Sequence, residues 1–97
     1  LDQSVGRIVK KLEELKIEGN TWIIFTSDNG GLATTEGPNT PATSNAPSRE
    51  GKGWLYEGGL RQAAFARWPG VIPAGRVSDE PWAFWDLLPT AAEVAGA

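Results

Sequence analysis

The sequence predicts an α/β fold, in which amphipathic helices pack against a sheet of buried strands. Near the start, apolar residues recur at helical spacing, and a short run of β-branched and aromatic residues follows them directly. A second amphipathic segment closes the sequence. A helix, a short connection and a buried strand in that order are typical of one half of a parallel α/β layer. At 97 residues the chain is one domain at most, or a piece of a larger one.

The first predicted helix covers Asp2–Lys16. Its charged residues fall mostly on the face opposite the apolar ones, as expected for a helix that lies on a core. We expect Asp2 or Ser4 to cap the start of this helix and Gly19 to end it. The apolar positions that define the helical spacing are Val5, Ile8, Val9, Leu12 and Leu15.

A strand predicted over Trp22–Thr26 follows, and its composition indicates burial on both faces. The apolar run ends abruptly in the sequence S-D-N-G-G at 27–31. In open α/β sheets, ligands bind just past the carboxyl ends of strands. The segment 27–31 is therefore the first place in the chain where we expect a functional site.

The remaining elements are less regular. Residues 32–49 are rich in Thr, Ser, Asn and Pro and predict a long loop, which in a compact domain is usually functional or disordered. Residues 62–68 predict a second strand. A second helix is predicted with its regular part beginning near Leu88, because Pro89 is best tolerated near a helix start, and with Gly96 as its end.

Composition excludes several classes of protein. The net charge of −3 argues against a non-specific nucleic-acid surface, and no stretch approaches the length of a membrane span. The chain has no cysteine, which removes disulfides, thiolate metal sites and a cysteine nucleophile. It also has no histidine, the commonest general base near neutral pH. A complete hydrolase with neither would be unusual, so we expect the chain to be part of a larger enzyme.

Two polar features carry the candidate chemistry. Asp28 and Asn29 offer carboxylate and amide oxygens, the hard ligands that Ca²⁺ and Mg²⁺ prefer, although two ligands do not complete a site. The alternative is a turn without function, because Asp, Asn and Gly also favour turns. Lys52 is the only cation in the glycine-rich stretch 51–59 and can contact an anionic ester, the alternative being a solvated surface lysine.

These motifs have an order and spacing that resemble one known family. S-D-N-G-G at 27–31, G-K-G-W-L-Y-E-G-G-L-R at 51–61, R-W-P-G at 67–70 and D-L-L-P-T at 86–90 resemble the formylglycine-dependent sulfatases, across essentially the whole chain. The resemblance implies a segment of an alkaline-phosphatase-like sandwich, with a mixed, largely parallel sheet flanked by helices. It also implies hydrolysis of sulfate monoesters with bound Ca²⁺.

The resemblance also implies roles for individual residues. Asp28 and Asn29 match the family's metal ligands, and Lys52 matches the lysine that contacts the substrate sulfate. The residues that match the E-G-G-x-R run are interpreted as structural support, with a modest ion pair between the first and last of them. These are Glu57, Gly58, Gly59 and Arg61.

The chain departs from the family at the nucleophile. The family's formylglycine is made from Cys or Ser in a C/S-x-P-S-R motif, and only the last three letters of that motif occur here, at 47–49. Asn45 stands at the place of the modified residue and cannot become an aldehyde by that route, so we interpret this match as coincidence. The family's other acidic ligands, its histidines and its second lysine are missing as well. We therefore expect residues 1–97 to be a partial sulfatase domain that is inactive alone, with the formylglycine elsewhere in the protein.

The expected partner is a sulfated small molecule or a sulfated carbohydrate, and relatives of this kind are often periplasmic or secreted. Exposed sheet edges would also favour self-association. Two alternative functions remain open from the residues. One is a phosphoric ester hydrolase on the same fold, and the other is a non-catalytic module that binds an anion or a sugar.

Overall fold

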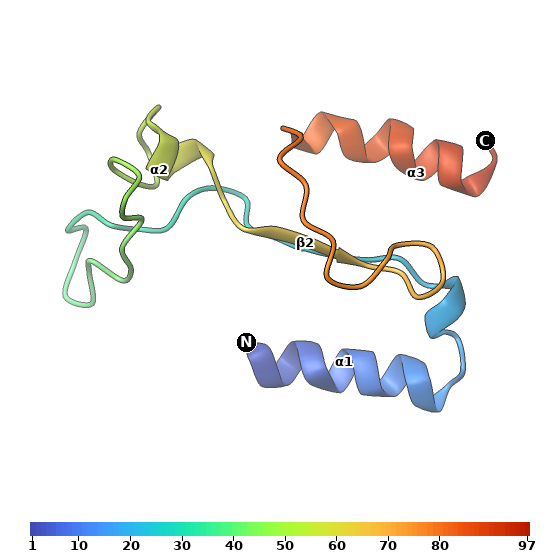
Figure 1. Ribbon diagram of the computed structural model, residues 1–97. Coiled ribbons are helices and arrows are strands. Elements are labelled where there is room, and N and C mark those ends of the chain that lie inside the picture. The colour runs from blue at the N-terminus through green and yellow to red at the C-terminus, as the bar shows by residue number, and fades with distance from the viewer.

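The computed structural model describes residues 1–97 and contains helices on both sides of a small sheet (Figure 1). Two short 3₁₀ helices, η1 (Glu18–Asn20) and η2 (Phe84–Asp86), precede the first strand and the last helix. No helix has both the length and the apolar content needed to cross a membrane. The main elements are α1 (Asp2–Glu14), β1 (Ile23–Thr26), α2 (Glu57–Leu60), β2 (Ala64–Arg67) and α3 (Leu87–Ala95).

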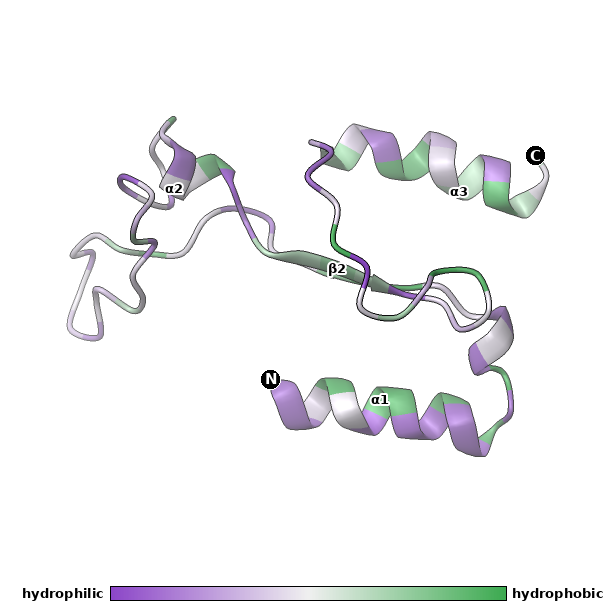
Figure 2. Ribbon diagram, viewed as in Figure 1, coloured by the Kyte–Doolittle hydropathy of each residue, from purple (hydrophilic) through white to green (hydrophobic).

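The apolar stripe predicted for α1 faces the strands, as the green side of this helix in Figure 2 shows. Not every predicted position is covered, because Ile8 and Leu15 remain 57% and 55% exposed. The stripe therefore lies on the sheet along only part of its width. The half-buried apolar residues of α1 are Val5, Val9 and Leu12.

The predicted ends of α1 are wrong. Leu1 occupies the N-cap position, with no side-chain hydrogen bond, in place of Asp2 or Ser4. The helix ends at Glu14, before Gly19, because Lys16 adopts the left-handed conformation with φ 57°.

The end of α1 is a Schellman motif. The N–H of Ile17 donates to the carbonyl of Leu12 at 3.1 Å, and the N–H of Lys16 donates to the carbonyl of Glu13 at 3.0 Å. Glycine normally occupies the left-handed position because it has no Cβ to strain. In this helix the motif closes around a lysine.

The prediction for α3 is confirmed, including its end. The helix begins at Leu87, with Pro89 in its first turn, where the missing N–H is not needed by the helix. Gly96 lies just past the last turn with φ 74°, and the N–H of Ala97 donates to the carbonyl of Ala92 at 3.0 Å. This is the Schellman pattern again, here with the expected glycine.

The two strands form one antiparallel pair, with Phe25 opposite Phe65. The two phenyl rings stack with centroids 4.6 Å apart and planes 5° apart. At the other end of the pair, Trp22 and Trp68 stack at 6.4 Å, and the indole N–H of Trp68 donates to the carbonyl of Gly19 at 2.9 Å. Aromatic cross-strand pairs of this kind stabilise a short ladder.

The strand prediction for 62–68 is confirmed, and the chain is α/β. Its single strand pair, β1 with β2, is antiparallel, and the chain has no parallel strand pair. A mixed sheet permits an antiparallel pair of this kind. The chain returns alongside β1 after the long loop, and adjacent strands that run in opposite directions pair in this way.

The sheet lies between α1 and α3 (Figure 1). Successive side chains of a strand point to opposite faces. One face carries Arg67, whose guanidinium lies 3.5 Å from the Glu13 carboxylate of α1. The opposite face carries Ile24 and Ala66 toward α3.

The interior between these layers is open. No apolar side chain is fully buried, and every residue of β1 is only half-buried, so burial of β1 on both faces is not reached within this chain. The radius of gyration is 16.3 Å. A compact domain of this length would have a radius of about 12–13 Å. The helices and strands are therefore arranged as layers without a closed core.

The left-handed lysine generates a prediction. We expect Lys16→Gly to raise the free energy of unfolding by about 1 kcal/mol, because glycine removes the Cβ strain at positive φ. Lys10→Gly, in the middle of α1, is the matched control and should lower it by about 1 kcal/mol. Urea denaturation followed by circular dichroism measures both changes, and a loss of stability in Lys16→Gly would contradict the assignment.

Candidate functional site

The four buried residues of the chain are all glycines, Gly30, Gly51, Gly58 and Gly59, which we call the glycine cluster. They pack backbone against backbone. A Cβ on Gly30 would collide with the carbonyl of Gly58, and a Cβ on Gly51 would collide with the carbonyl of Gly31. A Cβ on Gly59 would come within 2.6 Å of the Gly51 carbonyl oxygen. No larger residue fits at these positions without moving the backbone.

Backbone hydrogen bonds join the segments that meet at the glycine cluster. The N–H of Gly30 donates to the carbonyl of Gly59 at 2.9 Å, which ties the turn after β1 to α2. The N–H of Lys52 donates to the carbonyl of Gly31 at 3.1 Å, which ties the lysine segment to the same turn. Figure 1 shows α2 and the long loop at one end of the strands. The fold therefore brings the backbone of the two predicted site segments together.

Asp28 and Asn29 lie in the turn directly after β1. The Asp28 carboxylate is exposed and takes part in no ion pair. The amide nitrogen of Asn29 donates to the carbonyl of Gly30 at 2.9 Å, so its Oδ1 is the atom left to meet a cation.

This donor set suits part of a Ca²⁺ shell, because Ca²⁺ takes six to eight oxygen ligands. The chain offers no group of three or more His, Cys, Asp or Glu side chains that could hold a metal ion. Asp28 and Asn29 therefore fit a Ca²⁺ site as two of its ligands, and further oxygens must complete the shell.

Lys52 lies in the turn that follows Gly51, with its side chain exposed. The ammonium group takes part in none of the four ion pairs of the chain, so its charge is not neutralised by a carboxylate. Lys11, by contrast, is paired with Glu14 at 3.1 Å. Lys52 thus has an anchored backbone and a charge available to an anion.

Sequence reasoning missed the structural part of Asn45. Its carboxamide accepts a hydrogen bond from the N–H of Gly31 at 3.1 Å and donates to the carbonyls of Gly31 and Glu50 at 2.9 and 3.0 Å. These bonds are unrelated to the partial match between residues 45–49 and the nucleophile motif. The usable signal is that asparagine readily bonds to the backbone of loops.

Two further contacts hold the glycine-rich segment. The guanidinium of Arg49 lies 4.0 Å from the centre of the Tyr56 ring, a cation–π contact. The predicted ion pair between Glu57 and Arg61 is confirmed at 3.6 Å. Both of its side chains are mostly exposed, so its contribution to stability is small.

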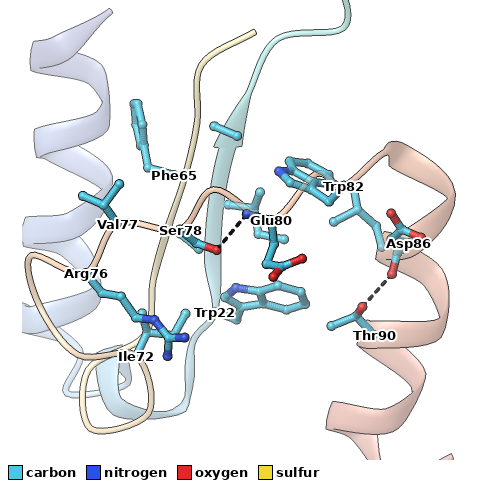
Figure 3. Close-up of a pocket in the computed structure, with 14 residues that line it drawn as sticks. Trp22, Phe65, Ile72, Arg76, Val77, Ser78, Glu80, Trp82, Asp86 and Thr90 are labelled. Carbon is cyan, nitrogen blue, oxygen red and sulfur yellow. Dashed lines mark hydrogen bonds between the residues drawn. The ribbon is translucent and has the colours of Figure 1, made fainter. Parts of the chain in front are cut away.

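Two cavities flank the sheet. The first, of about 640 Å³, lies between the sheet and α3 and is lined mainly by apolar side chains, among them Trp22, Ile72 and Trp82 (Figure 3). The second, of about 780 Å³, is lined by Asp28 and Asn29. The first cavity belongs to the open interior, whereas the second lies beside Asp28 and Asn29 and is not lined by Lys52. The second cavity is also lined by Arg61, Gln62, Trp82, Phe84 and Trp85.

Comparison with known proteins identifies relatives of the whole segment. The profile of the Sulfatase family matches residues 1–97. The chain is 49% identical to N-acetylgalactosamine-6-sulfatase of Sus scrofa over 96 residues, and 41% identical to the same enzyme of Homo sapiens over 96 residues. It is 39% identical to steryl-sulfatase of Rattus norvegicus over 99 residues.

These matches cover 99–100% of this chain but only 17–18% of each relative. The chain therefore spans less than a fifth of the length of the curated relatives that it matches. No solved structure matched the chain.

The glycine cluster generates the second prediction. We expect Gly58→Ala to lower the free energy of unfolding by about 1–3 kcal/mol, because its Cβ would lie 2.5 Å from the Arg49 carbonyl oxygen. Gly6→Ala is the matched control, since an added Cβ there meets no atom within 4 Å and should stabilise α1 by up to about 1 kcal/mol. Equal stability of the two variants in urea would show that the cluster does not hold the site.

Proposed function

Because this chain belongs to the sulfatase family, we propose that it forms part of a sulfuric ester hydrolase that cleaves sulfate monoesters. One set of relatives is named for a sugar and the other for a sterol. Both names share the sulfate ester, so we propose that the substrate of this protein is a sulfated small molecule or a sulfated carbohydrate. The match of the Sulfatase family to the whole of residues 1–97 is the observation that carries the proposal.

In this proposal Asp28 and Asn29 are two ligands of Ca²⁺, and Lys52 contacts the substrate sulfate. The contact that best supports these roles is the backbone hydrogen bond of 3.1 Å from the Lys52 N–H to the carbonyl of Gly31, which lies two residues after Asn29. A cation site and a free lysine on one backbone framework suit an ester that carries negative charge on several oxygens.

The chemistry follows from charge. As the S–O bond breaks, negative charge builds on the sulfate and on the leaving oxygen, and fixed positive charge stabilises it. The Lys52 ammonium supplies a point charge with three N–H donors. Bound Ca²⁺ would supply the second charge and polarise the sulfate.

The nucleophile of the proposed reaction lies outside residues 1–97. The chain has no cysteine and no complete C/S-x-P-S-R motif, and the Asn45 side chain at the first position of the partial match is fully engaged with the backbone. We therefore keep the formylglycine of the family as the expected nucleophile elsewhere in the protein, and we expect this segment alone to be inactive.

We also propose that residues 1–97 are a partial sulfatase domain within an alkaline-phosphatase-like sandwich whose sheet is mixed and largely parallel. Each strand here is paired on one edge only, and the large apolar side chains of Leu55, Trp85 and Leu88 are 78–89% exposed. Further strands and helices would cover these edges and faces. In the isolated segment, the same edges favour self-association.

The third prediction tests the site residues in the full-length protein. We expect Asp28→Asn and Lys52→Ala each to lower kcat/KM for an aryl sulfate by about 10²- to 10³-fold, because the first weakens the hold on Ca²⁺ and the second removes a positive charge that stabilises the transition state. Asp28→Asn should also weaken Ca²⁺ binding, measured by calorimetry. Asp2→Asn and Lys10→Ala, on α1, are the matched controls. Near-normal turnover in either site variant would remove that residue from the site.

The fourth prediction tests the reaction. The full-length protein should hydrolyse an aryl sulfate with a higher kcat/KM than the matching aryl phosphate, and a metal chelator should abolish turnover until Ca²⁺ is added back. Faster phosphate hydrolysis would favour the phosphatase alternative. Binding of sulfated sugar without turnover would favour a non-catalytic module.

A further inference from the structure

We propose that Asn45 is a positioning residue that holds Lys52 in a defined place relative to the turn that carries Asp28 and Asn29. The inference rests on the proposed function of those three residues. Asn45 itself would touch neither the metal nor the substrate, and it would act through the backbone of Gly31 and Glu50.

The carboxamide of Asn45 pairs with Gly31 as the peptide of a neighbouring strand would. It accepts from the Gly31 N–H at 3.1 Å and donates to the Gly31 carbonyl at 2.9 Å. Its second N–H donates to the carbonyl of Glu50 at 3.0 Å. One half-buried side chain thus joins the turn after β1 to the segment that leads into Lys52.

The backbone around the carboxamide leaves space for it. A Cβ on Gly31 would lie 2.9 Å from Asn45 Oδ1, and a Cβ on Gly51 would lie 2.6 Å from Asn45 Nδ2. Glycine at these two positions therefore allows the side chain to reach the backbone on both sides.

Among side chains of this length, only asparagine can make all three of these hydrogen bonds. An amide has one acceptor oxygen and two N–H donors, and Asn45 uses all three groups. Aspartate keeps the acceptor but places a negative charge against two carbonyl oxygens. Glutamine keeps the amide but moves it by one methylene group.

The three hydrogen bonds of Asn45 to Gly31 and Glu50, which we call the Asn45 clamp, matter because the Lys52 side chain is long and unpaired. Its ammonium can be placed only as well as its backbone is placed, and Lys52 N–H shares the Gly31 carbonyl with Asn45. The loop 32–49 between the two halves of the site has no helix or strand of its own. Asn45 therefore supplies a cross-link near the end of a long, otherwise irregular connection.

The kinetic test uses the full-length protein. We expect Asn45→Ala and Asn45→Gln each to lower kcat/KM for an aryl sulfate by about 10- to 100-fold, the usual effect of removing a residue that orients a site. Ser44→Ala is the matched control, because the Ser44 hydroxyl accepts only the N–H of Ala46 at 3.3 Å in the same loop. Activity of both Asn45 variants within twofold of this control would overturn the proposal.

A double-mutant cycle separates positioning from a general loss of stability. If Asn45 acts through Lys52, then Asn45→Ala should cost less than threefold when Lys52 is already alanine. A structural effect unrelated to Lys52 would instead multiply fully with Lys52→Ala, and that result would overturn the proposal.

Hydrogen exchange gives a readout that needs no activity. In the wild-type protein the amides of Gly31 and Lys52 should be protected, and Asn45→Ala should speed their exchange at least tenfold while Ser44→Ala leaves it unchanged. Absence of sulfate hydrolysis by the wild type would refute the proposed function alone, because this exchange pattern still reports the clamp. If the Gly31 and Lys52 amides of the wild-type protein exchanged as fast as amides of an unfolded chain, the proposed Asn45 clamp would be wrong.

Discussion

The contact between backbone segments in the glycine cluster is the constraint on which the candidate site depends. Gly30, Gly51, Gly58 and Gly59 are the only buried residues, and added Cβ atoms would collide with neighbouring carbonyls. Because no side chains intervene, backbone N–H and carbonyl groups from distant segments come within hydrogen-bonding distance. The turn after β1, the lysine segment and α2 are thereby held as one unit by directional bonds, whose geometry is more restrictive than apolar packing.

Local order and global packing differ in this chain. At the candidate site, hydrogen bonds within this chain join the turn after β1 to the segment that leads into Lys52, and Asn45 makes three of them. The apolar layers are not completed, and a cavity of about 640 Å³ separates the sheet from α3. A hydrogen bond needs one donor and one acceptor, whereas apolar burial needs a neighbour on every side. The framework of the site can therefore be defined where the core is still open.

The helix ends show how local rules are both followed and overridden. Gly96 ends α3 as its sequence position predicts, since glycine adopts a left-handed conformation without strain. In α1 the same motif closes around Lys16, although Gly19 is close by. The hydrogen bond from the Ile17 N–H to the Leu12 carbonyl closes the end of α1, where the chain leaves the helix toward η1 and β1. A preference of one residue type is weaker than the path that the chain has to follow.

The sequence by itself determined the α/β class, both main helices, both strands and the polar turn after β1, because hydrophobic spacing and turn residues are local signals. It also identified Asp28, Asn29 and Lys52 as candidates by motif and order. Only the tertiary structure decided the antiparallel pairing, the burial of the four glycines and the bonds of Asn45 to Gly31. These depend on contacts between residues far apart in the chain, and no local pattern of residue types specifies which distant backbone groups will meet.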